Sequence, residues 1–92
     1  MAQKRVHIWV SGRVQGVCFR QFTLKNAGEL GVKGWVKNLL DGKVEAVFEG
    51  ESHSIDKLIR LCGQGPSFGR VEHLELMKEA YKDEFENFKI TY

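Results

Sequence analysis

Five short segments of the chain have the pattern of β-strands, in which apolar and polar residues alternate or an apolar run lies between turn residues. The segments are residues 6–10, 35–39, 44–48, 71–77 and 88–92. The first is the clearest, because Val6, Ile8 and Val10 alternate with His7 and Trp9. A strong hairpin signal, Asp-Gly, separates the second segment from the third. The pattern predicts strands that bury one face.

Two further segments have the periodicity of amphipathic helices. The first segment is residues 20–30, in which Thr23, Ala27 and Leu30 lie on one face. Phe19, just before the segment, falls on the same face. The second segment has the i, i+3, i+4, i+7 spacing in Ile55, Leu58, Ile59 and Cys62. Gly31 is expected to end the first helix, and the glycines and proline in residues 63–66 the second. Ser52 and Ser54 are the expected N-caps of the second helix.

The order of these elements predicts the fold. Strand, helix, strand, strand, helix and strand, followed by a terminal strand, is the split βαβ pattern of a ferredoxin-like α/β sandwich in the α+β class. Both helices should cover one face of an antiparallel sheet, and 92 residues fit one domain over residues 1–92. Val71 is out of phase with Leu74 and Leu76, which predicts a β-bulge or a late start of that strand. A polar connection is expected over residues 78–83.

The predicted topology brings two distant segments together at one edge of the sheet. Each split βαβ unit has parallel outer strands joined by a right-handed crossover, so the strands at 6–10 and 35–39 point the same way. The loop Gly12–Arg20 and the residue Asn38 therefore follow strands that end at the same edge. These strands lie about 10 Å apart, which a loop and an arginine side chain can span. We predict that Arg20 and Asn38 face one shared pocket.

The loop GRVQGVCFR, Gly12–Arg20, has the features of an anion-binding turn at the start of a helix. Main-chain N–H groups at a helix N-terminus attract negative charge, and an arginine adds charge-assisted hydrogen bonds. The loop is neither a P-loop nor a dinucleotide fingerprint, because the residues that define those motifs are missing. Taken alone, it could also be a simple glycine turn with Arg20 as a surface cation.

Asn38 is the second candidate, because asparagine is depleted in strands and its position needs a reason. One interpretation is local capping of the hairpin turn that follows. The other is that its amide holds a water or a substrate oxygen, since an amide both donates and accepts hydrogen bonds without titrating.

Composition narrows the range of partners and locations. The net charge of +2 permits a small anionic substrate but is not typical of a nucleic-acid-binding protein. The apolar stretch Val6–Val10 is too short for a signal peptide or a membrane span, so we expect a cytoplasmic protein that does not bind membranes. Cys18 and Cys62 are then expected as free thiols. The three histidines are isolated in the sequence, which gives little support to a metal site.

Two motifs together resemble the acylphosphatase family: GRVQGVCFR at 12–20 and GWVKNLLDGKVE at 34–45. The similarity extends to the Gly65-Pro66 break and to the terminal strand that ends in an aromatic residue. It therefore covers nearly the whole chain. The length fits the free-standing form of the family better than a domain within a larger hydrogenase-maturation protein.

The resemblance implies hydrolysis of the carboxyl–phosphate bond of small acyl phosphates, without a metal or cofactor. Inorganic phosphate is the expected product and inhibitor, and a monomer is the expected state. The family's catalytic arginine falls on Arg20 and its water-holding asparagine on Asn38. Its phosphate-binding backbone falls on six residues: Gln15, Gly16, Val17, Cys18, Phe19 and Arg20.

The chemistry of an acyl phosphate is compatible with these residues. The substrate is a mixed anhydride and already a good electrophile. The enzyme mainly has to bind a dianionic phosphoryl group, direct a water in line and stabilise charge on the equatorial oxygens. Neither motif contains an obvious side-chain base, so a phosphate oxygen of the substrate is expected to take the water's proton. A covalent route through the Cys18 thiol is less favoured, since only its N–H is needed.

Other side chains have simpler interpretations. His7 and His73 are expected to be packing or surface residues, and Cys62 to be part of the core. Glu45 and Glu49 are expected on the solvated face of their strand. A separate hypothesis, suggested by the short terminal strand, is that the α-carboxylate of Tyr92 pairs with Arg20 when no substrate is bound.

The alternative function is a non-catalytic ferredoxin-like module that binds phosphate or RNA or regulates a partner. Ferredoxin-like sheets often bind RNA through exposed aromatic residues, and Trp9, Trp35 and Phe48 are the candidates here. The chain has no run that combines basic, glycine and aromatic residues in the RNA-binding pattern. We therefore interpret these aromatics as packing residues.

Overall fold

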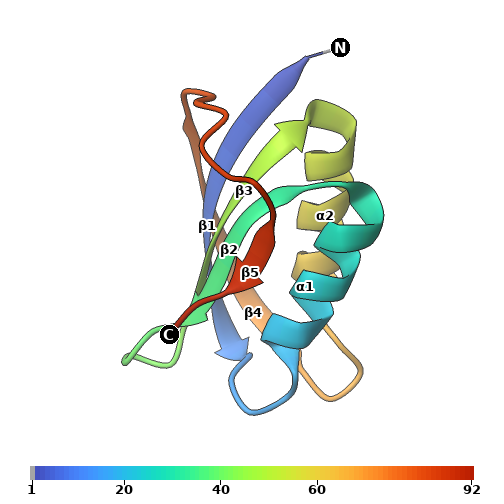
Figure 1. Ribbon diagram of the computed structural model, residues 1–92. Coiled ribbons are helices and arrows are strands. Elements are labelled where there is room, and N and C mark those ends of the chain that lie inside the picture. Colours follow the sequence, from blue (N-terminus) through green and yellow to red (C-terminus); the bar gives the residue numbers. More distant parts are fainter. Residues whose placement is uncertain (1) are drawn as a thin grey trace.

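The computed structural model describes residues 2–92, which form two helices against a five-stranded sheet (Figure 1). The elements are β1 (Gln3–Arg13), α1 (Phe19–Leu30), β2 (Lys33–Asn38), β3 (Val44–Glu51), α2 (Ser52–Gln64), β4 (Arg70–Glu79) and β5 (Phe88–Ile90). This is the predicted order with its additional terminal strand, so the ferredoxin-like α+β fold is confirmed.

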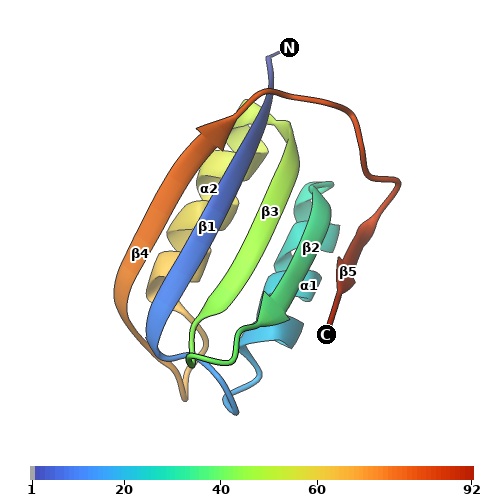
Figure 2. The ribbon, with the colours of Figure 1, turned by 90° about the vertical axis from the view of Figure 1, so that its left-hand side faces the viewer.

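The sheet has the strand order β4-β1-β3-β2-β5. β3 lies between β1 and β2 and is antiparallel to both, so β1 and β2 point the same way, as predicted. β5 pairs with β2 in parallel, which makes the sheet mixed rather than wholly antiparallel. Both helices cover one face, and Figure 2 shows them behind the sheet with the opposite face toward the viewer.

The core lies between the two helices and the face of the sheet that they cover. β1 contributes its alternating residues, Val6, Ile8 and Val10, and β3 contributes Phe48, all of them buried. The buried helical residues are Phe19, Thr23 and Ala27 in α1 and Ile55, Leu58 and Cys62 in α2. The predicted apolar faces of both helices are therefore confirmed. Neither helix in the described part of the chain has the length and apolarity needed to cross a membrane.

Several element boundaries differ from the sequence predictions: β1 is longer at both ends than residues 6–10, β2 begins at Lys33, β5 ends at Ile90, and two further boundaries have a clear cause. The N-cap of α2 is Glu51, whose side chain makes no capping hydrogen bond, so the prediction of Ser52 or Ser54 as N-cap is wrong. The reason is that β3 runs directly into α2, and the last residue of the strand occupies the capping position. β4 extends to Glu79, beyond the predicted end at residue 77, because it stays paired with β1 as far as Arg5.

The irregularity predicted from the phase of Val71 is present in β4. Ser11 pairs with His73, whereas the next residue of β1, Gly12, pairs with Val71. Glu72 is thus an additional residue in β4, which is the arrangement of a β-bulge. The bulge lies where β1 approaches the loop that leads into α1.

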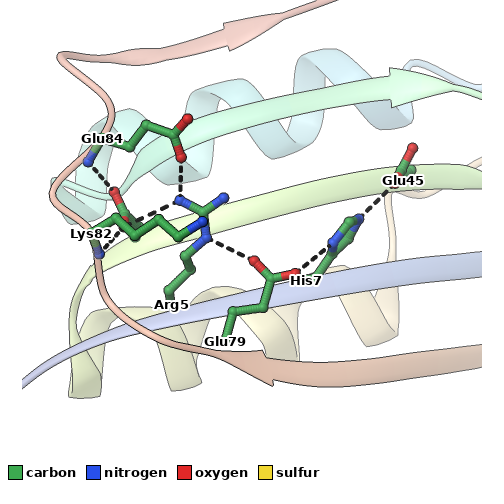
Figure 3. A network of polar contacts seen from close by, with 7 residues as sticks. Arg5, His7, Glu45, Glu79, Lys82 and Glu84 are labelled. Atoms are coloured by element: carbon green, nitrogen blue, oxygen red, sulfur yellow. Dashed lines mark hydrogen bonds and ion pairs between the residues drawn. The ribbon is translucent and has the colours of Figure 1, made fainter.

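A cluster of charged residues occupies one end of the sheet face that the helices leave uncovered (Figure 3). Glu49 of β3 is only 2% exposed, so the expectation of a solvated position is wrong. Its carboxylate accepts hydrogen bonds from the main-chain N–H groups of Lys82 and Glu84, both at 2.8 Å, and lies 3.3 Å from Nη1 of Arg5. Alternation in β3 predicts on which face Glu49 lies, but not that residues 80–84 pass over it.

His7 lies farther along the same face, between two carboxylates (Figure 3). Its Nε2 is 2.6 Å from Glu45 and its Nδ1 is 3.0 Å from Glu79. The ring stacks on Trp9 with centroids 4.1 Å apart and meets Trp35 edge to face. His7 and both tryptophans are therefore packing residues, as expected, and Glu45 is half-buried against the histidine rather than fully solvated.

Candidate active site

The loop between β1 and α1 contains two left-handed residues. Gly16 has φ 74° and Cys18, the N-cap of α1, has φ 64°. Glycine adopts this conformation readily, whereas a residue with a side chain pays roughly 1–2 kcal/mol for it. Val17 between them has negative φ, and this alternation is the backbone pattern of an anion-binding nest. The loop thus holds a strained conformation that suits an anion.

The main-chain N–H groups at the start of α1 are available to a ligand. Along the chain, Phe22 has the first N–H group that makes a helical hydrogen bond. It donates to the carbonyl oxygen of Cys18, the N-cap, at 2.9 Å. Within residues 2–92, the N–H groups from Gly16 to Gln21 make no well-formed hydrogen bond to a main-chain acceptor. Donors at a helix N-terminus also carry the positive end of the helix dipole, so they favour a negatively charged ligand.

Arg20 and Asn38 lie in one pocket, which confirms the prediction from topology. The pocket has a volume of about 300 Å³ and is lined by Val14, Gly16, Cys18, Phe19, Arg20, Gln21, Asn38, Ile90 and Tyr92. Of the predicted phosphate-binding residues, Gln15 and Val17 do not line it. Arg20 has the only charged side chain in this lining, and no carboxylate or histidine side chain belongs to it.

Asn38 lines the pocket and has an unpaired acceptor. Its Oδ1 is buried and has no hydrogen-bond partner in the described part of the chain. A buried polar atom without a partner costs about 1–3 kcal/mol, so it favours a bound water or ligand that donates to it. Asn38 is the last residue of β2, where its pairing with Val44 fixes the backbone.

Arg20 contacts the ring of Tyr92 rather than its carboxylate. The guanidinium Cζ lies 5.2 Å from the ring centroid, a cation–π geometry. Arg20 makes no ion pair within residues 2–92, so the predicted pairing with the chain-terminal carboxylate is wrong. The Thr91 N–H donates to the Val36 carbonyl oxygen at 2.8 Å and continues the pairing along β2, which brings the Tyr92 ring to the pocket. The guanidinium hydrogen-bond donors therefore remain available to an anion.

Sequence reasoning assigned Gln15 only a main-chain role and missed its side chain. The Gln15 amide Nε2 donates to the carbonyl oxygens of Leu39, at 2.7 Å, and Lys43, at 2.9 Å. These acceptors belong to the turn that follows Asn38. Nothing in a single sequence connects this glutamine to a turn more than twenty residues away, so no signal could have identified the contact.

The two cysteines have different environments. Both are free thiols, but Cys18 is exposed at the pocket and Cys62 is buried in the core, where its Sγ lies 3.8 Å from Oγ1 of Thr23 in α1. Burial raises the pKa of the Cys62 thiol to about 12, against a weaker lowering by Thr23. Cys62 is therefore an inert core residue, as predicted. In the described residues, no group of three or more His, Cys, Asp or Glu side chains is placed to hold a metal ion.

Comparison with known proteins agrees with this fold and pocket. The family model described as acylphosphatase matches residues 6–90. An acylphosphatase of Syntrophus aciditrophicus is 54% identical over 97% of this chain and 93% of its own length. The crystal structure of acylphosphatase from Bacillus subtilis has a TM-score of 0.93 at 32% identity and covers 97% of this chain and 99% of that one. Full-length HypF in its phosphate- and nucleotide-bound form has a TM-score of 0.86 at 26% identity, over 99% of this chain but 12% of that one.

The fold, the pocket and these relatives define a small hydrolase with a ferredoxin-like sandwich. The chain belongs to the acylphosphatase family. It is an enzyme that hydrolyses acyl phosphates to a carboxylate and inorganic phosphate.

Proposed function

We propose that the Gln15–Arg20 loop and the Arg20 guanidinium hold the phosphoryl group of the acyl phosphate while Asn38 positions the attacking water. One observation carries this proposal: Asn38, whose buried Oδ1 has no partner in the described residues, lines the same pocket as Arg20, which has the only charged side chain there. A water that donates to Oδ1 removes the cost of the unpaired acceptor. The same water then lies in the pocket that holds the phosphoryl group.

The phosphoryl group is bound mainly by fixed donors. The unpaired N–H groups from Gly16 to Gln21 can donate to its oxygens, and Arg20 can add two parallel charge-assisted hydrogen bonds. These donors stabilise the charge that spreads over the equatorial oxygens in the transition state. Because the start of α1 fixes them before substrate binds, little reorganisation accompanies the reaction.

The chemical step then needs only a directed water. Asn38 accepts a hydrogen bond from the water through Oδ1, which turns an oxygen lone pair toward phosphorus, opposite the leaving carboxylate. The bond from the water oxygen to phosphorus forms while the bond from phosphorus to the carboxyl oxygen breaks. The carboxylate leaves with the electron pair, and the water's proton passes to a phosphoryl oxygen, so the products are a carboxylate and dihydrogen phosphate.

The proton acceptor and the source of positive charge follow from the lining of the pocket. No carboxylate or histidine side chain lines it, which supports the substrate itself as the group that takes the proton. We propose that no metal or cofactor takes part, because Arg20 and the N–H groups supply the positive charge. Full activity in the presence of a chelator is the expected result.

Hydrolysis of benzoyl phosphate by two variants tests the roles of Arg20 and Asn38. Asn38→Ala should lower kcat by about 100-fold or more, the scale of a misplaced reactant, while inhibition by phosphate survives. Arg20→Ala should lower kcat by about 100- to 1,000-fold and also weaken phosphate inhibition. Asn87→Ala and Arg60→Ala make the same changes at exposed positions and serve as controls. Near-normal turnover by Asn38→Ala, or unchanged phosphate inhibition in Arg20→Ala, would show that the assigned role is wrong.

The proposal extends to the setting in which the enzyme works. Residues 1–92, of which Met1 lies outside the described part, act as a single domain and a monomer in the cytoplasm, without nucleic acid. The mild net charge of +2 supports the absence of nucleic-acid binding. The packing of Trp9 and Trp35 around His7 supports it too, because these rings are then not free to stack on bases. Sedimentation analysis and an RNA-binding assay at several salt concentrations test the oligomeric state and the absence of RNA binding.

A further inference from the structure

The side chain of Gln15 connects the two halves of the pocket. Gln15 belongs to the loop between β1 and α1, and its Nε2 donates to the carbonyl oxygens of Leu39 and Lys43. An amide nitrogen has two hydrogens, so both donors of Gln15 are used. Figures 1 and 2 show the loop before α1 and the turn between β2 and β3 at the same end of the sheet.

The two acceptors form the base of the turn that begins after Asn38. Leu39 is the next residue in the chain, and its N–H donates to the Lys43 carbonyl oxygen at 2.8 Å. The Lys43 oxygen therefore accepts from both Leu39 and Gln15. Through these bonds, the side chain of Gln15 fixes the backbone directly beyond Asn38.

Sheet pairing alone does not provide this connection. Both Val10 of β1 and Asn38 of β2 pair with the same residue of β3, Val44, which is the last row of the ladder at this end. Beyond that row, the two Gln15 hydrogen bonds are the only ones in residues 2–92 that join residues 14–18 to residues 39–43. Beyond the last paired row, the Gln15 side chain is thus the hydrogen-bonded connection between the phosphate-binding loop and the backbone that follows Asn38.

We infer that Gln15 is a positioning residue, which sets the place of Asn38 and of its water relative to the bound phosphoryl group. This inference rests on the proposed roles of Asn38 and the loop. Displacement of a reacting group by about 1 Å can lower the rate by about 100-fold. The N–H groups that bind phosphate belong to the loop itself and do not need the side chain. Loss of the Gln15 contacts should therefore lower kcat and leave phosphate binding nearly unchanged.

The decisive variant is Gln15→Met, which keeps nearly the length and volume of glutamine but has no hydrogen-bond donor. We expect kcat on benzoyl phosphate to fall by about 10- to 100-fold, with less than about a twofold change in the phosphate inhibition constant. Gln64→Met makes the same change at an exposed position at the end of α2 and should leave both constants unchanged. Thermal unfolding of each variant verifies that the enzyme is folded at the assay temperature. If Gln15→Met does not fold, Gln15→Asn, which retains the amide but is too short to reach both carbonyls, should show the same selective loss of kcat.

A double variant separates positioning of Asn38 from any other effect of Gln15. In the Asn38→Ala background, Gln15→Met should change kcat by less than about twofold, because the group that it positions is absent. An equal loss of kcat in both backgrounds would overturn the inference, as would normal kcat in Gln15→Met or a parallel loss of phosphate binding. Failure of the proposed function looks different, since Asn38→Ala alone would then keep its turnover.

Discussion

The buried carboxylate of Glu49 should make a large contribution to stability, and Glu49→Gln tests it with almost no change in shape. The native carboxylate accepts hydrogen bonds from Lys82 N–H, from Glu84 N–H and from Arg5. A glutamine has one acceptor oxygen, so its NH₂ group must face one of these donors. The change therefore removes the charge and at least one buried hydrogen bond, and it loosens the segment that leads from β4 to β5.

The size of the effect follows from the partners that remain. Breaking a buried ion pair costs about 3–5 kcal/mol when the other charge is left uncompensated. Arg5 keeps Glu79 at 2.7 Å and Glu84 at 2.6 Å, so its charge stays compensated and the lower end of that range is the upper limit. A lost hydrogen bond to a charged group and a buried donor left unpaired together bring the cost to about 3 kcal/mol. In a domain of this size each kcal/mol shifts the melting temperature by about 4–8 °C, so we expect a fall of about 12–24 °C.

Urea unfolding followed by tryptophan fluorescence measures this difference in the free energy of unfolding. Glu29→Gln, at an exposed position on α1, is the matched control and should stay within about 0.5 kcal/mol of the wild type. If Glu49→Gln lowers the free energy of unfolding by less than about 1 kcal/mol, with an unchanged m-value, the reasoning is refuted. A decrease that small is the size expected for the loss of an exposed ion pair.

Three further predictions concern pH, backbone space and thiol accessibility. Burial raises the pKa of Glu49, but hydrogen bonds from the main chain and from Arg5 outweigh it, so the folded-state pKa lies below the ordinary value of 4.5. The stability advantage of the wild type over Glu49→Gln is then constant well above pH 4.5 and shrinks as the pH falls through the lowered pKa, which urea titrations at several pH values can check. Gly34→Ala should prevent stable folding, because φ there is 141° and the added methyl group would overlap the Val47 carbonyl oxygen; circular dichroism measures the loss. Iodoacetamide should label Cys18 in the native protein and leave Cys62 unlabelled until urea is added, as mass spectrometry of peptides would show.

The sequence was sufficient to predict the antiparallel part of the sheet, both helices and the meeting of Arg20 with Asn38, but not the parallel pairing of β5 with β2. These features depend on periodicity and on the handedness of the crossover, which are local or general properties. The burial of Glu49 and the contact of the Tyr92 ring with Arg20 were not predicted, because each depends on where the last part of the chain passes. The side-chain contacts of Gln15 were missed for a related reason. Alternation shows which face a residue occupies, but it does not show which distant backbone groups lie beside it.

The dependence of the proposed phosphate site on main-chain N–H groups has a consequence for the ligand. Main-chain N–H groups do not ionise in the working pH range of an enzyme, and arginine stays charged throughout it. These donors therefore present the same field to an anion at every such pH, and a change in affinity has to come from the anion or from the ionisable groups of Cys18 and Tyr92, which also line the pocket. Inhibition by phosphate should follow the second ionisation of phosphate, and a monoanionic and a dianionic inhibitor of equal size should differ in their pH profiles only by their own titration.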